Sequence, residues 1–138
     1  MGNKVTIGEK FFTLRGKGNC KTNNVIYLFI CILCKKGYVG KTDTPLHVRT
    51  NKHRNPGKVK ENTKFPQHDY HALSRHAVLH NVPFDECYRL YIVENVHNPD
   101  FLVPREGFFV DFFGTKEPFG LNIDNPLPIT SSRLTNAP

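Results

Sequence analysis

The sequence has no apolar segment long enough to cross a membrane, and it has few cysteines. The longest apolar run, residues 25–34, has ten residues, about half of the ~20 that a membrane-spanning helix needs. The opening Met-Gly-Asn-Lys leads into no hydrophobic signal core, and no Asn-x-Ser/Thr site occurs. Four cysteines in 138 residues are too few for a disulfide scaffold. These absences predict no membrane role and an intracellular location, nuclear or cytoplasmic, rather than secretion.

Acidic residues are scarce in the first half of the chain. Residues 1–64 carry 3 acidic and 14 basic side chains, residues 65–138 carry 9 acidic and 5 basic ones, and the formal net charge is +7. A basic half beside a mildly acidic half favours a polyanionic partner such as nucleic acid. The alternative is a soluble protein with a charged N-terminal arm.

The length of 138 residues is that of one domain with a single modest core. Glycines and polar residues predict a basic lead-in at residues 1–22. The Pro-, Ser- and Thr-rich residues 125–138 predict a C-terminal tail. We therefore expect the folded domain to occupy residues 23–124.

Local patterns predict three strands and three helices in this domain. β-Branched and aromatic residues predict a strand buried on both faces at 25–31, a short strand at 36–41 and an alternating strand at 86–96. Helices are expected at about 45–54, at about 70–81, and from near Pro104 to a stop at Gly114. The first two strands are expected to form an antiparallel hairpin with Cys31 and Cys34 near its tip.

Five side chains that suit phosphate chemistry are brought near one another by these elements. Tyr27 and Tyr38 stand on the two strands of the hairpin, and Lys41 follows the second tyrosine. Arg49 and His53 are four residues apart, on one face of the first helix. Arginine holds a phosphate with a bidentate fork and lysine holds it as a point charge. The structural alternative is a core Tyr27 and a solvated Arg49.

The order of these residues resembles the signature of the GIY-YIG nucleases. Val-Ile-Tyr ends at Tyr27 and Tyr-Val-Gly begins at Tyr38, with Val25 in place of the leading glycine and Val39 in place of isoleucine. Further matches follow in family order over residues 20–124: Leu46, Arg49, His53, the Arg-Glu-Gly-Phe-Phe run at 105–109, and Gly120-Leu121-Asn122. The resemblance implies an α+β fold, with a small three-stranded antiparallel sheet flanked by helices.

The resemblance also implies phosphodiester hydrolysis. Glu106 would be the sole protein ligand of a Mg²⁺ or Mn²⁺ ion, which would polarise the phosphate. Tyr27 or Tyr38 would orient or deprotonate the attacking water, and the resemblance favours Tyr27. The other implied roles are phosphate binding by Arg49, support of negative charge by Lys41, proton transfer or backbone contact by His53, and ordering of the site by Asn122.

The cysteines resemble those of the endonuclease domain of Penelope-like retroelements, which belong to mobile genetic elements. Cys31-x-x-Cys34 lies between the two tyrosine motifs, where that group has a cysteine pair. Its histidine pair would here be His76 and His80, four residues apart on the predicted helix at 70–81. Two cysteines and two histidines complete a tetrahedral structural Zn²⁺ site, which would tie the hairpin tip to that helix. A reverse transcriptase domain or protein is a further partner that this resemblance implies.

The predicted partner is DNA, bound through its phosphate backbone. The side chains expected to make these contacts are the basic ones of residues 35–64: Lys35, Lys36, Lys41, Lys52, Arg54, Lys58, Lys60 and Lys64. The alternative function is a catalytically weak, zinc-stabilised module that only binds nucleic acid.

Other interpretations of the cysteines and histidines stay open at this point. A Cys-x-x-Cys redox pair would need a helix that begins at the first cysteine, where a strand is predicted. Three further histidines compete as zinc ligands, namely His47, His68 and His71. Cys87 is expected in the core, and Cys20 is unassigned.

Overall fold

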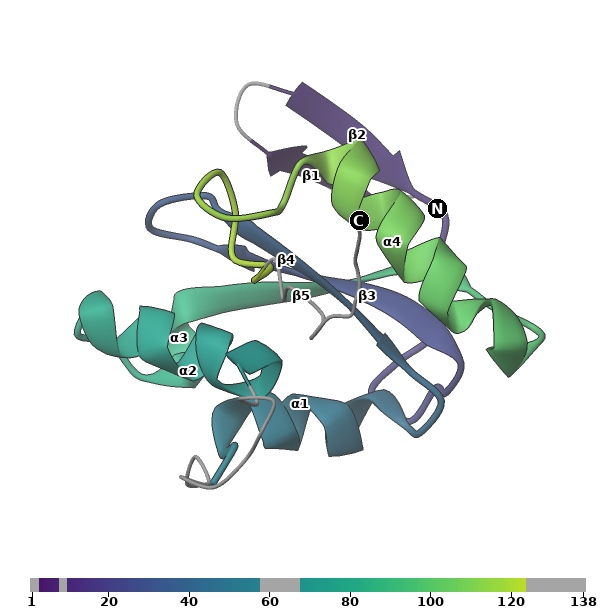
Figure 1. Ribbon diagram of the computed structural model, residues 1–138, viewed down its shortest axis with the longest axis horizontal. Helices are drawn as coiled ribbons and strands as arrows, with labels where there is room; N and C mark the ends of the chain where they lie inside the picture. Colours follow the sequence, from purple (N-terminus) through teal and green to yellow (C-terminus); the bar gives the residue numbers. More distant parts are fainter. Residues whose placement is uncertain (1–2, 8–9, 58–67, 124–138) are drawn as a thin grey trace, which may run out of the picture.

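The computed structural model describes residues 3–7, 10–57 and 68–123. At its centre is a three-stranded antiparallel sheet with the order β4-β3-β5, flanked by helices (Figure 1), which confirms the expected α+β fold. The elements in chain order are β1 (Asn3–Ile7), β2 (Lys10–Leu14), β3 (Val25–Cys31), β4 (Gly37–Thr42), α1 (Leu46–Arg54), α2 (His68–Leu79), α3 (Phe84–Cys87), β5 (Tyr88–Asn95), a 3-10 turn η1 (Pro99–Phe101) and α4 (Leu102–Phe113).

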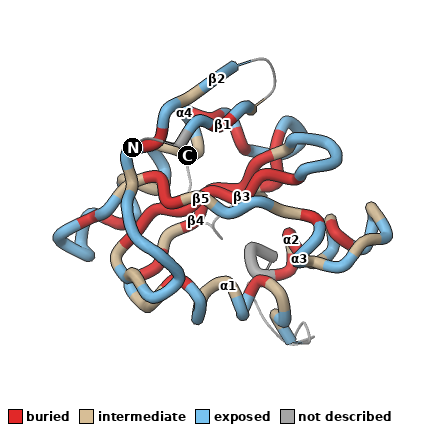
Figure 2. Tube along the Cα trace, turned by 180° about the vertical axis from the view of Figure 1, so that it is seen from behind, coloured by how far each residue is buried: buried red, intermediate tan, exposed pale blue. Residues whose placement is uncertain are grey.

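The central strand β3 is buried along its whole length because both faces of the sheet are covered. Successive side chains of a strand point to opposite faces. Val25, Tyr27 and Phe29 pack with Leu46 of α1 and Leu73 of α2. The buried positions run through the middle of the molecule, and the outer turns are exposed (Figure 2). One face of the sheet therefore carries the first predicted tyrosine against α1 and α2.

The opposite face of the sheet packs against α4 and the β1–β2 hairpin (Figure 1). Ile26, Leu28 and Ile30 of β3 share this core with Val93 of β5 and Phe113 of α4. An unbroken apolar strand is what this two-sided burial requires. The prediction of a fully buried strand at 25–31 is thus confirmed.

The β1–β2 hairpin was missed by the prediction of a basic lead-in at residues 1–22. Val5 and Leu14 are buried in the same core as the sheet. The Phe12 ring contacts the rings of Phe112 and Phe113, with centroids 5.2 and 4.9 Å apart. Each strand has five residues. The alternation of inward and outward positions is therefore too short to predict a strand from the sequence. Such short strands are fixed by contacts with α4 that local patterns do not reveal.

The other predicted elements are present, with shifts at their ends. Residues 86–87, predicted as the start of the strand at 86–96, belong instead to the short helix α3, because Pro83 precedes it and Asp85 and Glu86 stand in its first turn. Helix α4 begins at Leu102, so that Pro104 lies in its first turn, where the missing N–H costs no hydrogen bond. The predicted tail at 125–138 lies outside the described residues.

The segment after α4 closes the outer edge of β4. The side-chain amide of Asn122 accepts from the Val39 N–H and donates to the Val39 carbonyl, both at 2.9 Å. The Leu121 N–H donates to the Gly37 carbonyl at 2.8 Å, and the Thr115 hydroxyl donates to Asn122 Oδ1 at 2.6 Å. These bonds fix the predicted site residue Asn122 beside Tyr38.

Within the described residues, none of the helices combines the length and the apolar character needed to cross a membrane.

Candidate functional site

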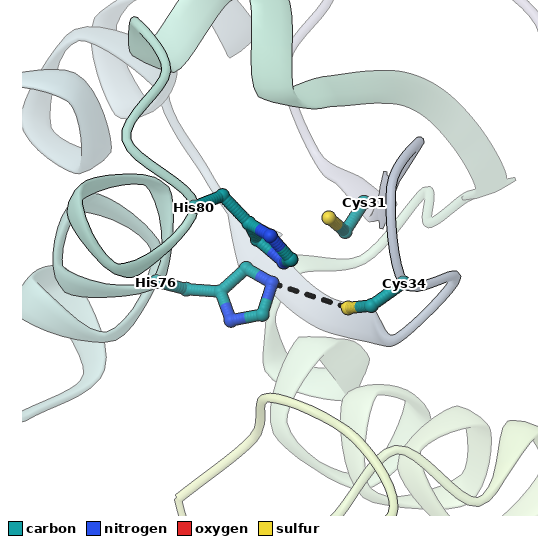
Figure 3. Close-up of side chains that lie close together, drawn as sticks. All are labelled: Cys31, Cys34, His76 and His80. Atoms are coloured by element: carbon teal, nitrogen blue, oxygen red, sulfur yellow. Dashed lines mark hydrogen bonds between the residues drawn. The ribbon is translucent and has the colours of Figure 1, made fainter.

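The two cysteines and two histidines predicted as metal ligands lie together. Cys31 ends β3, Cys34 lies in the turn that follows, and His76 and His80 come from the end of α2 (Figure 3). The four ligand atoms all lie within 4.8 Å of one another. The Cys34 Sγ and the His76 Nε2 are 3.3 Å apart, close to the ~3.5 Å between sulfur and nitrogen ligands around one tetrahedral Zn²⁺. The cluster could therefore hold a metal ion after small side-chain movements.

Local backbone geometry places these ligands. The Lys35 N–H donates to the Cys31 carbonyl, and the Cys31 N–H donates to the Lys36 carbonyl, both at 2.9 Å, so that the turn folds back on itself. Lys35 takes a left-handed φ of 69° inside it. On the other side, the His80 N–H donates to the His76 carbonyl at 3.1 Å. The two imidazoles consequently face the turn from consecutive helical turns.

The surroundings of His76 and Cys31 favour the forms that bind a metal, a neutral imidazole and a thiolate. Burial, followed by the charges of His80 and Lys36, lowers the pKa of His76 and favours its neutral, metal-binding form. Although burial works against it, hydrogen bonds with the backbone of Cys34 and Leu33 lower the pKa of Cys31. Burial and the adjacent Cys31 raise the pKa of Cys34. Cys31 is thus the thiol of the pair that ionises more readily.

The competing ligands are engaged elsewhere. The His47 Nδ1 bonds to the Cys20 carbonyl and the His71 Nε2 to the Gly57 carbonyl, each at 2.9 Å. The side chain of His68 lies outside the described positions. Cys87 is buried as expected, with its Sγ 3.8 Å from that of Cys31. Cys31 ends a strand and begins no helix, so the arrangement that activates a redox Cys-x-x-Cys is missing.

A second cluster joins the two tyrosines to His53. The Tyr27 hydroxyl and the His53 Nε2 form a hydrogen bond of 2.6 Å. The ring centroids of Tyr38 and His53 are 5.1 Å apart. Tyr27 and His53 are each 1% exposed, and Tyr38 is 4% exposed. Burial, together with the positive charge of Arg49, lowers the pKa of His53 to about 3. This histidine is therefore a neutral hydrogen-bonding partner at physiological pH.

The buried His53 gives a first prediction, that the free energy of unfolding falls as the pH falls below about 6.5. The pKa of His53 is 6.5 unperturbed and about 3 in the fold. Between these values the unfolded chain binds one more proton, so stability is lost at about 1.4 kcal/mol per pH unit as the pH drops. Urea unfolding between about pH 4.5 and 7 should show this extra slope in the wild type and not in His53→Gln. Equal slopes in both proteins would contradict the prediction.

Gly40 gives a second prediction. It pairs with Tyr27 across β3 and β4, and a Cβ at this position would overlap the Tyr27 ring and hydroxyl. We expect Gly40→Ala to lower the free energy of unfolding by about 1–3 kcal/mol. The matched control is Gly107→Ala in α4, where a Cβ meets nothing within 4 Å, so that helix propensity raises stability by about 0.5–1 kcal/mol. Urea denaturation measures the free energy of unfolding of both variants. A Gly40→Ala variant as stable as the wild type would refute the prediction.

Tyr38 also lines a cavity of ≈ 280 Å³ beside β4. Glu106, Asp111 and Lys116 line it from α4 and the following turn, and Asn122 lines it from the segment that closes the β4 edge. The Asp111 side chain is 78% exposed, and its carboxylate lies 4.0 Å from the Lys116 ammonium. Two carboxylates, a tyrosine and a lysine therefore line this cavity.

Six of the seven residues predicted as catalytic fall into two groups that share Tyr38. On the α1 side of the sheet His53 contacts Tyr38, bonds to Tyr27 and lies near Arg49, whose charge acts on it. Glu106 and Asn122 share the cavity with it. Lys41 is half-buried and, three residues beyond Tyr38 on the same strand, points to the opposite face.

Asp111 and Lys116 are cavity residues that sequence reasoning missed. Asp111 follows Glu106 by five residues in α4, which is not the spacing of three or four that places two side chains on one helix face, so the sequence carried no clear signal for it. Lys116 reaches the cavity only because the chain turns back at Gly114, where φ is 65°. No sequence spacing predicts that return.

Comparison with known proteins adds no assignment: no family model matches the chain, and neither the curated proteins nor the solved structures contain a match.

Proposed function

We propose that this chain is a divalent-metal-dependent DNA endonuclease of the GIY-YIG type, resembling the endonuclease domain of Penelope-like retroelements. The observation that carries the proposal is the cavity beside β4, where Glu106, Tyr38 and Asn122 meet. His53 contacts Tyr38 and supplies a neutral imidazole, and Arg49, whose charge acts on His53, supplies a guanidinium. A carboxylate, a phenol, a guanidinium and an imidazole around one strand are the groups that metal-assisted phosphodiester hydrolysis uses.

The residues of the cavity fit a hydrated Mg²⁺ or Mn²⁺ ion. Such an ion keeps several waters and is held by one or two carboxylates, and the cavity of ≈ 280 Å³ has Glu106 and Asp111 in its wall. The Asn122 amide is committed to Val39 and Thr115, so it orders the wall and is no ligand. When bound, the ion would supply Lewis-acid polarisation of the phosphate.

The remaining chemistry falls to the side chains around Tyr38. Because Tyr38 lines the cavity and Tyr27 is 1% exposed, Tyr38 orients the attacking water in this proposal. Tyr27 instead bonds to His53 and positions it. Arg49 holds the scissile phosphate, and Lys116 adds a positive charge at the cavity wall. The family resemblance favoured Tyr27 as the residue that acts on the water, and this assignment gives that role to Tyr38 instead.

Zinc is the metal proposed for the cluster of Cys31, Cys34, His76 and His80. A Cys₂His₂ set with no fifth position fits a closed, structural Zn²⁺ site. The ion would join the β3–β4 turn to α2, which otherwise contact each other at the small core of Cys31, Ala77 and Cys87. Its role in this proposal is to hold α2 against the sheet, and it takes no part in cleavage.

The proposed function is tested by incubating the zinc-loaded protein with supercoiled plasmid. We expect nicked circles with added Mg²⁺ or Mn²⁺ and none when these ions are omitted. Omission is preferable to a chelator, because a chelator would also remove the structural zinc. If the folded, zinc-loaded protein binds DNA and cleaves none of it across divalent ions, the endonuclease proposal fails. The chain would then be a nucleic-acid-binding module.

A further inference from the structure

The loop between β2 and β3 carries exposed basic side chains in a fixed conformation. Arg15, Lys17 and Lys21 are exposed within seven residues. No acidic residue occurs between residues 10 and 42. The loop and β5 enclose a cavity of ≈ 420 Å³, lined by residues 16–20, by Leu90, Tyr91 and Ile92 of β5 and by Leu46 of α1. The walls of this recess are partly apolar and partly polar, and Lys17 is the charged residue that lines it.

The first half of the loop is held against the edge of β5. The Lys17 N–H donates to Asn95 Oδ1, and the Asn95 side-chain amide donates to the Lys17 carbonyl, both at 2.8 Å. A Cβ on Gly16 would overlap the backbone of Ile92. Only glycine allows this approach, so the chain is in close contact with the strand at this point.

The second half of the loop is held against α1. The Thr22 hydroxyl accepts from the Asn19 N–H at 2.9 Å, and the Asn19 side chain accepts from the Lys21 N–H at 2.8 Å. The Cys20 carbonyl accepts from both the backbone N–H and the Nδ1 of His47, at 2.7 and 2.9 Å. Lys17 and Lys21 enter these bonds through their backbone, which leaves their exposed side chains available from a fixed stretch of backbone.

The charge of this loop continues onto α1. That helix has no acidic residue and carries Arg49 and Lys52, together with Arg54, which is ion-paired with Asp85 at 2.8 Å. Exposed cations held on a fixed backbone, with no acidic residue in their own segment, are the pattern of a phosphate-backbone contact. An array that only kept the protein soluble would not need a backbone fixed by the Gly16 contact and by a network of side-chain bonds.

We propose that the 15–21 loop is a second DNA-binding site, which holds backbone phosphates at the β5 edge of the sheet. This inference rests on the proposed function, since it names a further contact with the same substrate class. The β5 edge lies on the opposite side of the sheet from β4 and its cavity. Binding at the loop is therefore separable from chemistry at Glu106. None of the loop residues was among those predicted to contact DNA, which began at Lys35.

The test is the affinity for a fluorescein-labelled DNA duplex, measured by anisotropy without added Mg²⁺ at several salt concentrations. We expect Lys17→Ala/Lys21→Ala to weaken binding about tenfold or more near 0.1 M salt and to reduce the slope of log Kd against log salt by about 2, since each lost phosphate contact contributes ~0.9. The matched control is Lys4→Ala/Lys10→Ala, which removes the same charge from exposed positions on the β1–β2 hairpin. The control should keep the wild-type slope.

Three outcomes separate this inference from the proposed function. Loss of affinity and slope only in the loop variant supports the second site, whether or not the wild type cleaves DNA. A loop variant that matches the hairpin control overturns the second site, and wild-type nicking activity would then leave the endonuclease standing. A wild type that binds no DNA overturns the second site as well.

Discussion

Replacing His76 with alanine is expected to abolish stoichiometric zinc binding and to lower the free energy of unfolding by at least about 4 kcal/mol. This is the stabilisation that a ligand gives when its free concentration is about 1,000 times its dissociation constant. The His76 Nε2 lies 3.3 Å from the Cys34 Sγ, and three protein ligands do not make a closed structural site. Zinc content by elemental analysis and urea unfolding of the same preparations measure the two effects.

The matched control for this prediction is His47→Ala. His47 is exposed, lies outside the metal cluster and bonds the Cys20 carbonyl. Its loss should leave about one zinc per chain and reduce the free energy of unfolding by only about 1 kcal/mol. If His76→Ala keeps its zinc and unfolds like His47→Ala, the ion is held elsewhere, and the assignment of this cluster is wrong.

The second large effect is expected for Glu106→Gln, which should reduce the rate of DNA cleavage by about 1,000-fold. The substitution keeps the size of the side chain and removes the charge that would bind the catalytic ion. A Lewis-acid contribution of several kcal/mol corresponds to this loss, because each 1.4 kcal/mol is about tenfold in rate. Folding should be unaffected, since Glu106 is only half-buried and lies at the cavity wall.

Asp111→Asn is the control that separates the catalytic ion from the general charge of the cavity. Asp111 lines the same cavity, is 78% exposed and lies 4.0 Å from Lys116. The change removes a single charge from the wall of the same cavity, and its effect on the rate should stay below about tenfold. Comparable losses in both variants would mean that the two carboxylates hold the ion jointly.

The predictions from sequence were reliable where the pattern was local and strong. The seven apolar residues of β3 fit only a strand covered on both faces. The His76–His80 spacing places two imidazoles on one face of any helix, so bringing them to the Cys31–Cys34 turn required only that α2 pack beside β3. The described structure bears this out.

Other features were hidden because they depend on tertiary contacts. The β1–β2 hairpin is stabilised by Phe12 against Phe112 and Phe113, a contact between residues a hundred positions apart. The split between Tyr27, which is buried against His53, and Tyr38, which lines the cavity, follows from the closing of the β4 edge by Asn122. No spacing along the chain tells which of two buried tyrosines on neighbouring strands lines the cavity.

The nicking of supercoiled plasmid by wild type and Glu106→Gln, side by side with Mg²⁺ and with zinc content verified for both, tests the central claim most directly. The account predicts Mg²⁺-dependent nicked circles for the wild type and about 1,000-fold slower nicking for the zinc-loaded variant. Cleavage that survives unchanged in Glu106→Gln would contradict the assignment of the cavity beside β4 as the active site.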